Sequence, residues 1–264
     1  MAILSQFQVE EDRETLQAHT GVLRGQFALV TGAGSGIGKA IAHLLAAEGA
    51  TVALIGRTKA KLEITADGFP LDASEPFIVP TELTSDKELD SLRGELEFRC
   101  PQLDILVLCA GEIAHGPVAS APVEVLDTLY QTNVRANFRL VQSFLPLLKR
   151  AKKYPGQIVF MNSSVGLCAR AEASQYSATQ HALKALADAV RAEVNIDGIR
   201  VLSVYPGRVA TPAQELLYKN QNTPYQPELL LQPEDIASIV LSALTLPRTA
   251  EVTDISIRPL RKSY

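Results

Sequence analysis

Short runs of apolar, often β-branched residues alternate with longer amphipathic stretches along most of the chain. The runs predict seven strands, at residues 27–31, 51–56, 76–80, 104–109, 157–162, 200–205 and 251–257. The stretches between them predict helices at about 37–48, 59–66, 85–99, 122–149, 175–195 and 233–244. Strands that alternate with helices in this way form a parallel sheet with helices on its faces. The pattern therefore predicts an α/β fold with a doubly wound, seven-stranded parallel sheet.

The first predicted helix has a continuous apolar face. Ile37, Ile41, Leu44 and Leu45 recur at spacings of three and four residues, so their side chains lie on one side of the helix. Gly49 follows as the C-terminal cap, because glycine adopts the left-handed conformation in which many helices end. We expect this helix to pack its apolar face on the sheet.

Two segments fall outside the alternation. Residues 211–232 are rich in proline, asparagine and glutamine and predict a mobile loop before the last helix. Residues 1–25 form an acidic extension, in which a short helix is expected around residues 9–18, and residues 26–264 are expected to form one domain. Apolar and aromatic residues of the 211–232 loop are expected to line a substrate pocket: Leu216, Leu217, Tyr218 and Tyr225.

Composition narrows the partners that this chain can have. With 264 residues, of which 47% are hydrophobic, the chain can bury a sizeable core. Its formal net charge of −4 provides no basic field for a nucleic-acid backbone, so nucleic acid is not expected as a partner. The histidines have no spacing typical of metal ligands, so we expect no metal site; they are His19, His43, His115 and His181.

Cysteine use and segment hydrophobicity predict a cytoplasmic protein. Cys100, Cys109 and Cys168 are widely spaced and form no CxxC pair, which suits a reducing compartment better than a disulfide framework. The first residues lack a basic segment followed by an apolar one, and no run of eighteen apolar residues occurs. We therefore expect neither export nor a membrane span.

The first predicted strand runs directly into the sequence TGAGSGIG, at residues 31–38. Gly32, Gly36 and Gly38 lie where the strand turns into a helix, so the backbone can approach a phosphate and the free N–H groups of the helix point at it. The spacing differs from GxGxxG because Ile37 stands where the third glycine would be needed. We expect a Rossmann-type domain in which this turn binds the phosphates of a dinucleotide.

The end of the second predicted strand indicates which dinucleotide binds. Many dinucleotide-binding proteins place an acidic residue there to bind the adenosine ribose hydroxyls, but this chain has Gly56. Arg57 follows at once, with Thr58 beside it, and can bind a 2′-phosphate. NADP, or NADPH in its reduced form, is therefore favoured over NAD.

From about Leu23 to the C-terminus, motifs in order along the chain resemble those of the short-chain dehydrogenase/reductase family. TGAGSGIG matches the family's TGxxxGxG, and PTELT at 80–84 resembles the segment that holds the adenine. LCAG at 108–111 stands at the NNAG position with both asparagines replaced, and PGRVAT at 206–211 is similar to the PGxVxT segment beside the nicotinamide carboxamide. The resemblance implies these cofactor-binding residues: Gly32, Ser35, Gly36, Ile37, Gly38, Arg57, Glu82, Leu83, Ala110, Gly111, Tyr176, Gln180, Pro206, Gly207, Val209 and Thr211.

The same resemblance implies the catalytic residues. Tyr176 would be the general acid/base that passes a proton to or from the substrate oxygen. Ser163 would orient that oxygen, because it keeps the S-x-x-G pattern to Gly166 and the family's thirteen-residue separation from Tyr176; Ser164 is the fallback. Asn133 would hold a water in the proton relay.

The chain departs from the family at the fourth catalytic position. The family places a lysine one helical turn after the tyrosine, where it lowers the tyrosine pKa and bonds the nicotinamide ribose, and this chain has Gln180 there. Glutamine can still hold the ribose, but losing a pKa shift of two or three units removes roughly 3 to 4 kcal/mol of tyrosinate stabilisation. His181 and Lys184 project to other sides of the helix, and His115 lies in a loop, so none is expected to replace the lysine.

These observations predict an oxidoreductase that transfers a hydride between NADP and a carbonyl or secondary alcohol, with activity reduced by Gln180. Reduction should suffer less than oxidation, because a neutral phenol is already the proton donor that reduction needs. Two alternatives stay open: a non-catalytic dinucleotide-binding or scaffold protein, and an engineered change at position 180. The family also implies a homodimer or homotetramer formed through the long helices predicted at 122–149 and 175–195.

Overall fold

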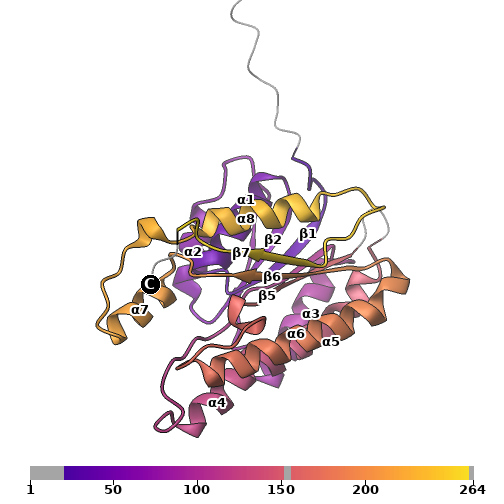
Figure 1. Ribbon diagram of the computed structural model, residues 1–264. Coiled ribbons are helices and arrows are strands. Elements are labelled where there is room, and N and C mark those ends of the chain that lie inside the picture. Colours follow the sequence, from indigo (N-terminus) through magenta and orange to yellow (C-terminus); the bar gives the residue numbers. More distant parts are fainter. Residues whose placement is uncertain (1–20, 152–155, 262–264) are drawn as a thin grey trace, which may run out of the picture.

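The structure, a computed structural model, describes residues 21–151 and 156–261. A seven-stranded parallel sheet lies between two layers of helices, which confirms the predicted fold class (Figure 1). The strand order is β3-β2-β1-β4-β5-β6-β7, so the direction of winding reverses between β1 and β4. The strands are β1 Phe27–Thr31, β2 Thr51–Gly56, β3 Phe77–Pro80, β4 Ile105–Leu108, β5 Gln157–Met161, β6 Arg200–Pro206 and β7 Asp254–Ile257.

The helices form one layer on each face of the sheet. One face carries α1 Gly36–Ala47, α2 Lys59–Asp67 and α8 Pro233–Leu244 (Figure 1). The other carries α3 Asp86–Arg99, α5 Ala136–Leu148 and α6 Ser174–Val194. Helices α4 Val123–Tyr130 and α7 Pro212–Asn220 project beyond the carboxyl ends of the strands, which places them beside the edge where α/β proteins bind ligands.

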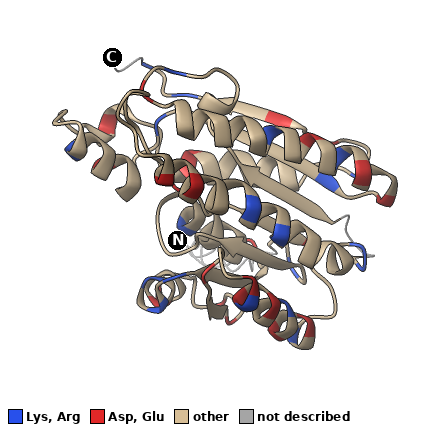
Figure 2. Cartoon of the chain, turned by 90° about the horizontal axis from the view of Figure 1, so that it is seen from below, with Lys and Arg blue, Asp and Glu red and all other residues tan. Residues whose placement is uncertain are grey.

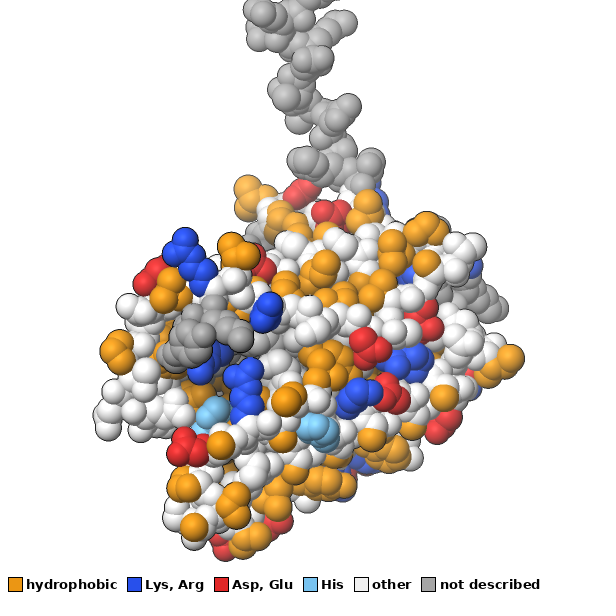
Figure 3. Space-filling model, in the orientation of Figure 1, with side chains coloured by type: hydrophobic (Ala, Val, Ile, Leu, Met, Phe, Trp, Pro, Cys, Tyr) orange, Lys and Arg blue, Asp and Glu red, His pale blue; other side chains and the backbone are white. Residues whose placement is uncertain are grey.

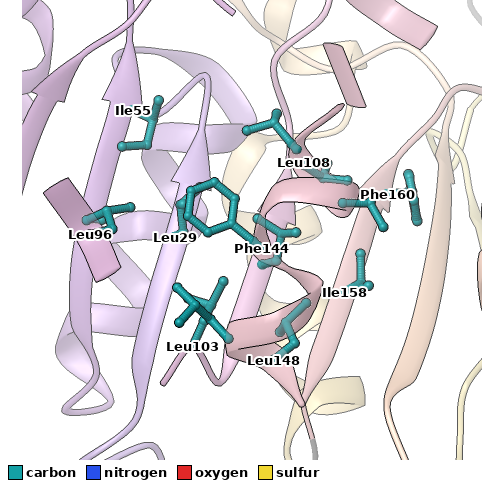
Figure 4. Packing of buried hydrophobic residues seen from close by; sticks show 14 of the residues in the cluster. Leu29, Ile55, Leu96, Leu103, Leu108, Phe144, Leu148, Ile158 and Phe160 are labelled. Carbon is teal, nitrogen blue, oxygen red and sulfur yellow. The ribbon is translucent and has the colours of Figure 1, made fainter. Parts of the chain in front are cut away.

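Each strand buries its two rows of side chains in different cores. Leu29 of β1 faces a core with α5, whereas its neighbours Ala28 and Val30 face the core with α1 and α8. Figure 4 shows Phe144 and Leu148 of α5 among the strand residues of the first core. Burial on both faces explains why the strands are continuous apolar runs in the sequence.

Helix α1 follows its sequence pattern. Ile41 and Leu45 are each 1% exposed, and Ile37 and Leu44 pack against the same core. The helix ends at Ala47, and Gly49 has a φ of +87°, the left-handed conformation expected after a helix end. The predicted apolar face and cap of this helix are therefore confirmed.

The single helix predicted at 122–149 is instead divided by a π turn. Residues Gln131–Arg135 form the turn, in which the Ala136 N–H bonds to the Gln131 carbonyl five residues back. Inside it, Asn133 turns its side chain to a neighbouring loop, and Asn137 Nδ2 donates to the Asn133 carbonyl at 2.7 Å. The Asn137 bond satisfies a backbone carbonyl that a regular helix would pair internally.

The prediction of a loop over residues 211–232 is wrong for Pro212–Asn220, which form α7, whereas residues 221–226 contain no helix or strand. Thr211 caps α7 by accepting a hydrogen bond from the Gln214 N–H, and a 3-10 turn follows at Pro227–Leu229. Tyr218 is 7% exposed, and its ring contacts that of Tyr225 at 5.5 Å between centroids. Proline and polar residues misled the prediction because they cap and begin helices as readily as they form loops.

A residue that precedes the first strand contributes to the core. Leu23 is 1% exposed, packs in the core with α1 and donates its N–H to the Glu48 carbonyl at 2.9 Å. The core therefore includes a residue that the sequence analysis assigned to the extension. The helix predicted around residues 9–18 lies outside the described residues.

Charged side chains lie mainly on the helices, with both signs interspersed (Figure 2). Some join neighbouring elements on the same face of the sheet: Arg135 pairs with Asp86 of α3 at 2.6 Å, and Arg139 of α5 pairs with both Asp86 and Asp90 at 3.3 Å. The face in Figure 3 likewise mixes the two signs around hydrophobic side chains over α8. None of the helices described for this chain combines the length and the apolar character needed to cross a membrane.

Candidate active site

The carboxyl ends of the central strands border a cavity of about 320 Å³. It lies at the point where the strand order reverses, the position at which open α/β sheets bind ligands. The cavity is lined by most residues that the sequence analysis selected: Gly32, Ser35, Gly36, Ile37, Gly38, Arg57, Glu82, Leu83, Ala110, Gly111, Asn133, Tyr176, Gln180 and Thr211. Segments far apart in the sequence therefore meet in one site.

The glycine turn leaves no room for larger side chains. A Cβ atom on Gly38 would lie 2.4 Å from the Gly32 carbonyl oxygen, and one on Gly36 would lie 2.9 Å from Thr211 Cγ2. Gly36 also has a φ of +51°, which favours glycine. The turn thus presents bare backbone and the N-terminus of α1 to the cavity, which suits a phosphate group.

Thr31 joins the glycine turn to the loop after β4, a role that the sequence analysis missed. Its Oγ1 accepts hydrogen bonds from the Cys109 N–H at 3.0 Å and the Ala110 N–H at 3.1 Å. Thr31 is fully buried, so its hydroxyl bonds to protein groups and not to solvent. The sequence offered one signal for this role, because Thr31 is the first residue of the TGxxxGxG motif.

The outer part of the cavity carries charged residues. Arg57 Nη1 lies 3.2 Å from Glu112 Oε1. Glu82 Oε1 accepts hydrogen bonds from the Thr84 N–H at 3.1 Å and its hydroxyl at 2.9 Å, so this carboxylate shapes its own loop. The backbone around Glu82 and Leu83 thereby borders the cavity in a fixed conformation.

Tyr176 lies in the inner part of the cavity. Burial raises the pKa of Tyr176 to about 12, and the hydrogen bond between the Tyr176 and Ser163 hydroxyls offsets only part of that effect. Ser163 itself accepts a weak hydrogen bond from the Val165 N–H at 3.4 Å. Tyr176 is therefore a neutral phenol near neutral pH, with a serine hydroxyl beside it.

Asn133 lines the cavity and also fixes the loop after β4. Its Oδ1 accepts from the Glu112 N–H at 2.8 Å, and its Nδ2 donates to the Glu112 carbonyl at 2.9 Å. Nδ2 also reaches Thr179 Oγ1 of α6 at 3.2 Å. Asn133 thus connects the cavity wall to the helix that carries Tyr176.

Gln180 is 4% exposed and lines the cavity, yet its Oε1 accepts no hydrogen bond from the described residues. Its backbone carbonyl is fixed by Asn162 Nδ2 at 3.0 Å, and Asn162 Oδ1 accepts from the Ser163 N–H at 2.7 Å. A buried acceptor without a partner costs free energy unless a ligand supplies a donor. Its position suits a ligand hydroxyl in the cavity.

The described cations near the site do not reach Tyr176. Lys184 Nζ pairs with Asp188 at 2.6 Å, and His181 Nδ1 contacts the Ser177 carbonyl at 2.8 Å on its own helix. Among described residues, the basic side chains that line the cavity are Arg57 and Lys61, which both follow β2. The charge that would stabilise a tyrosinate is therefore missing from the described site.

Some selected residues lie outside the cavity lining. Ser163 is not among the lining residues, but it forms a hydrogen bond with Tyr176, which lines the cavity. Val209 is 5% exposed and packs in the core with α8, and Pro206 and Gly207 do not line the cavity. The described residues include no group of three or more His, Cys, Asp or Glu side chains able to hold a metal ion. The expectation that the 211–232 segment lines a substrate pocket stays a prediction. Four of its residues do not line this cavity: Leu216, Leu217, Tyr218 and Tyr225.

The residues present fit a dinucleotide. The bare glycine turn suits its phosphates, Arg57 suits an additional phosphate, and Gln180 Oε1 suits a ribose hydroxyl. Residues 26–222 match the sequence model of the short chain dehydrogenase family.

Similar proteins cover nearly the whole chain. An uncharacterized oxidoreductase of Staphylococcus aureus (strain USA300) is 33% identical over 241 residues, which are 90% of this chain and 99% of that protein. A short chain dehydrogenase of Shigella flexneri complexed with NADP has a TM-score of 0.82 and 28% identity, over 90% of this chain and 98% of that one. An alcohol dehydrogenase of Thermococcus sibiricus complexed with 5-hydroxy-NADP has a TM-score of 0.80 and 27% identity, over 90% and 99%.

Proposed function

The chain belongs to the short chain dehydrogenase family, and from that premise we propose that it is an NADPH-dependent reductase of a carbonyl compound. The observation that carries this proposal is the meeting of Tyr176, Gln180 and the glycine turn in one cavity. When bound, NADPH would supply the hydride for the substrate carbon. The residues of this chain bind the dinucleotide, orient the substrate oxygen and donate a proton to it.

The residues at the end of β2 support the proposal that the chain binds NADP and not NAD. Gly56 leaves no carboxylate for the adenosine ribose, and the Arg57 guanidinium borders the cavity. The similar structures from Shigella flexneri and Thermococcus sibiricus contain NADP or a derivative of it. Glycine-turn residues, Ala110 and Thr211 would hold the rest of the dinucleotide.

Tyr176 is proposed as the proton donor, with Ser163 orienting the substrate oxygen. A phenol with a pKa near 12 stays protonated at neutral pH, so it can give a proton to a developing alkoxide. Oxidation of an alcohol needs the tyrosinate, which this site does not stabilise. The geometry therefore favours carbonyl reduction over alcohol oxidation.

Gln180 is proposed to stand where the family has its catalytic lysine, holding the ribose without supplying charge. Asn133 is proposed to act in the proton relay, with Asn137 on the carbonyl of Asn133. The sequence did offer a signal for Asn137, because two asparagines one helical turn apart are unfavourable in a helix unless their side chains are used.

The test measures NADPH oxidation with a panel of ketones and aldehydes. Wild type should turn over at least one of them, and Tyr176→Phe should abolish turnover while NADPH still binds. Unchanged turnover in Tyr176→Phe would exclude the role proposed for this tyrosine. A soak of crystals with NADPH would locate the dinucleotide.

A non-catalytic dinucleotide-binding protein is the second candidate. The specific observation in its favour is that no described cation lowers the pKa of Tyr176. Comparison with Gln180→Lys discriminates the two: activity that appears only in this variant would support the non-catalytic protein.

We also propose a cytoplasmic protein of one domain that forms a homodimer or homotetramer. The three cysteines are free, which suits a reducing compartment. Phe138 of α5 is 49% exposed, and Tyr130 of α4 is 50% exposed, so these helices carry apolar surface for association. Light scattering on the purified protein tests the oligomeric state.

A further inference from the structure

Arg57 and Glu112 form an ion pair between the two loops beside the glycine turn. Arg57 follows β2, Glu112 follows β4, and these strands are the two neighbours of β1. Their charged atoms lie 3.2 Å apart, and both residues line the cavity that the turn borders. The pair therefore spans the carboxyl end of β1, where the turn begins.

The two partners differ in side-chain exposure and in how their backbone is held. Both backbone groups of Glu112 are bonded by the side chain of Asn133, which is 1% exposed, so the acidic residue starts from a fixed point. The Glu112 side chain is 33% exposed, whereas that of Arg57 is 66% exposed. A dinucleotide phosphate can therefore draw Arg57 away while Glu112 stays in place.

We propose that Glu112 is a specificity-determining residue that competes with the 2′-phosphate of NADPH for Arg57; this rests on the function proposed above. A phosphate monoester carries about −1.5 to −2 charges near neutral pH and bonds a guanidinium at two points, so it displaces a single carboxylate. NADH has no such phosphate and leaves the ion pair intact. Glu112 thus weakens the binding of NADPH and leaves that of NADH unchanged.

The exposure of the pair limits the size of the effect. Ion pairs at this exposure change an equilibrium by about two- to fivefold. The competition should therefore shift the dissociation constant of NADPH by about two- to fivefold and leave that of NADH unchanged.

The experiment titrates NADPH and NADH by calorimetry, without substrate, into wild type, Glu112→Gln, Arg57→Gln and the double variant. Glu112→Gln should lower the dissociation constant of NADPH about two- to fivefold and leave that of NADH unchanged. When Arg57→Gln is also present, Glu112→Gln should no longer lower the dissociation constant of NADPH. No guanidinium then remains for which Glu112 and the phosphate could compete.

Glu63→Gln is the matched control. Glu63 lies on α2 and pairs with Lys59 at 3.3 Å, and it is not part of the cavity lining, so this variant removes the same charge without freeing Arg57. Both dissociation constants should stay at the wild-type values. Glu112→Ala should shift NADPH in the same direction as Glu112→Gln.

Three results would overturn the inference: equal shifts for NADPH and NADH, no shift for NADPH, or a gain that persists without Arg57. If wild type binds neither dinucleotide, the proposed function itself fails. If wild type binds NADPH but Glu112→Gln does not bind it more tightly, only the role of Glu112 fails.

Discussion

Tyr176 is a buried phenol whose pKa no described cation lowers. Its hydroxyl stays buried beside Ser163, but the residue one turn later is Gln180, whose amide carries no charge. Burial then acts almost alone on the phenol, and it raises the pKa because a tyrosinate is poorly solvated in the cavity. Tyr176 therefore stays protonated at neutral pH.

A pH profile checks the protonation state of Tyr176. The phenol stays protonated below its pKa, so carbonyl reduction in wild type should change less than about twofold between about pH 6 and pH 9. In Gln180→Lys the new ammonium should lower the pKa of Tyr176, so reduction should decline at a lower pH than in wild type. A wild-type decline centred near pH 7 would contradict this assignment.

Thr31→Val tests the buried hydroxyl that joins β1 to the loop after β4. The variant keeps the shape of the side chain but leaves the Cys109 and Ala110 amides without their acceptor, at a cost of about 1 to 3 kcal/mol in the free energy of unfolding. Urea unfolding measures the loss. Thr128→Val, at an exposed position on α4, is the control and should stay within about 0.5 kcal/mol of wild type.

At the scale of elements, the glycine turn and α1 depend on close approach between backbones. Helix α1 begins against the end of β1 because Gly38 has no Cβ to meet the Gly32 carbonyl. Helix α3 also contains a glycine, Gly94, but a Cβ there would have no atom within 4 Å. Gly38 is therefore required by the packing, whereas Gly94 can be replaced.

The single variants Gly38→Ala and Gly94→Ala should change the free energy of unfolding in opposite directions. Gly38→Ala should weaken NADPH binding and lower the free energy of unfolding, because its Cβ would lie 2.4 Å from a carbonyl oxygen. Gly94→Ala should raise the free energy of unfolding by about 0.4 to 1 kcal/mol, because alanine restricts the unfolded chain. Urea unfolding and calorimetric titration of each variant measure both effects; a destabilised Gly94→Ala would contradict the argument.

On the scale of the whole molecule, the two helical layers share a single sheet. Leu29 and Val30 are neighbours in β1, yet they belong to the cores on opposite faces. One core cannot be lost without removing support from the strands of the other. The proposed cavity lies at the edge of this shared sheet, so its geometry depends on both cores.

Differential scanning calorimetry checks this coupling. The chain should unfold in one transition, with the calorimetric enthalpy close to the van't Hoff enthalpy. NADPH should raise the melting temperature in a concentration-dependent way, because it binds the folded chain. Two separate transitions in the absence of ligand would show that the layers fold independently.

The sequence by itself determined the sheet, the order of its elements and the glycine turn, because buried strands, amphipathic helices and tight turns each have a local pattern. It also placed Tyr176 and Gln180 one turn apart. Only the tertiary structure decided the pairing of Arg57 with Glu112, the contacts of Asn133 and the folding of residues 212–220 into α7. These features join residues distant in the chain, or depend on the packing of one segment on others, and no local pattern records which side chains will meet.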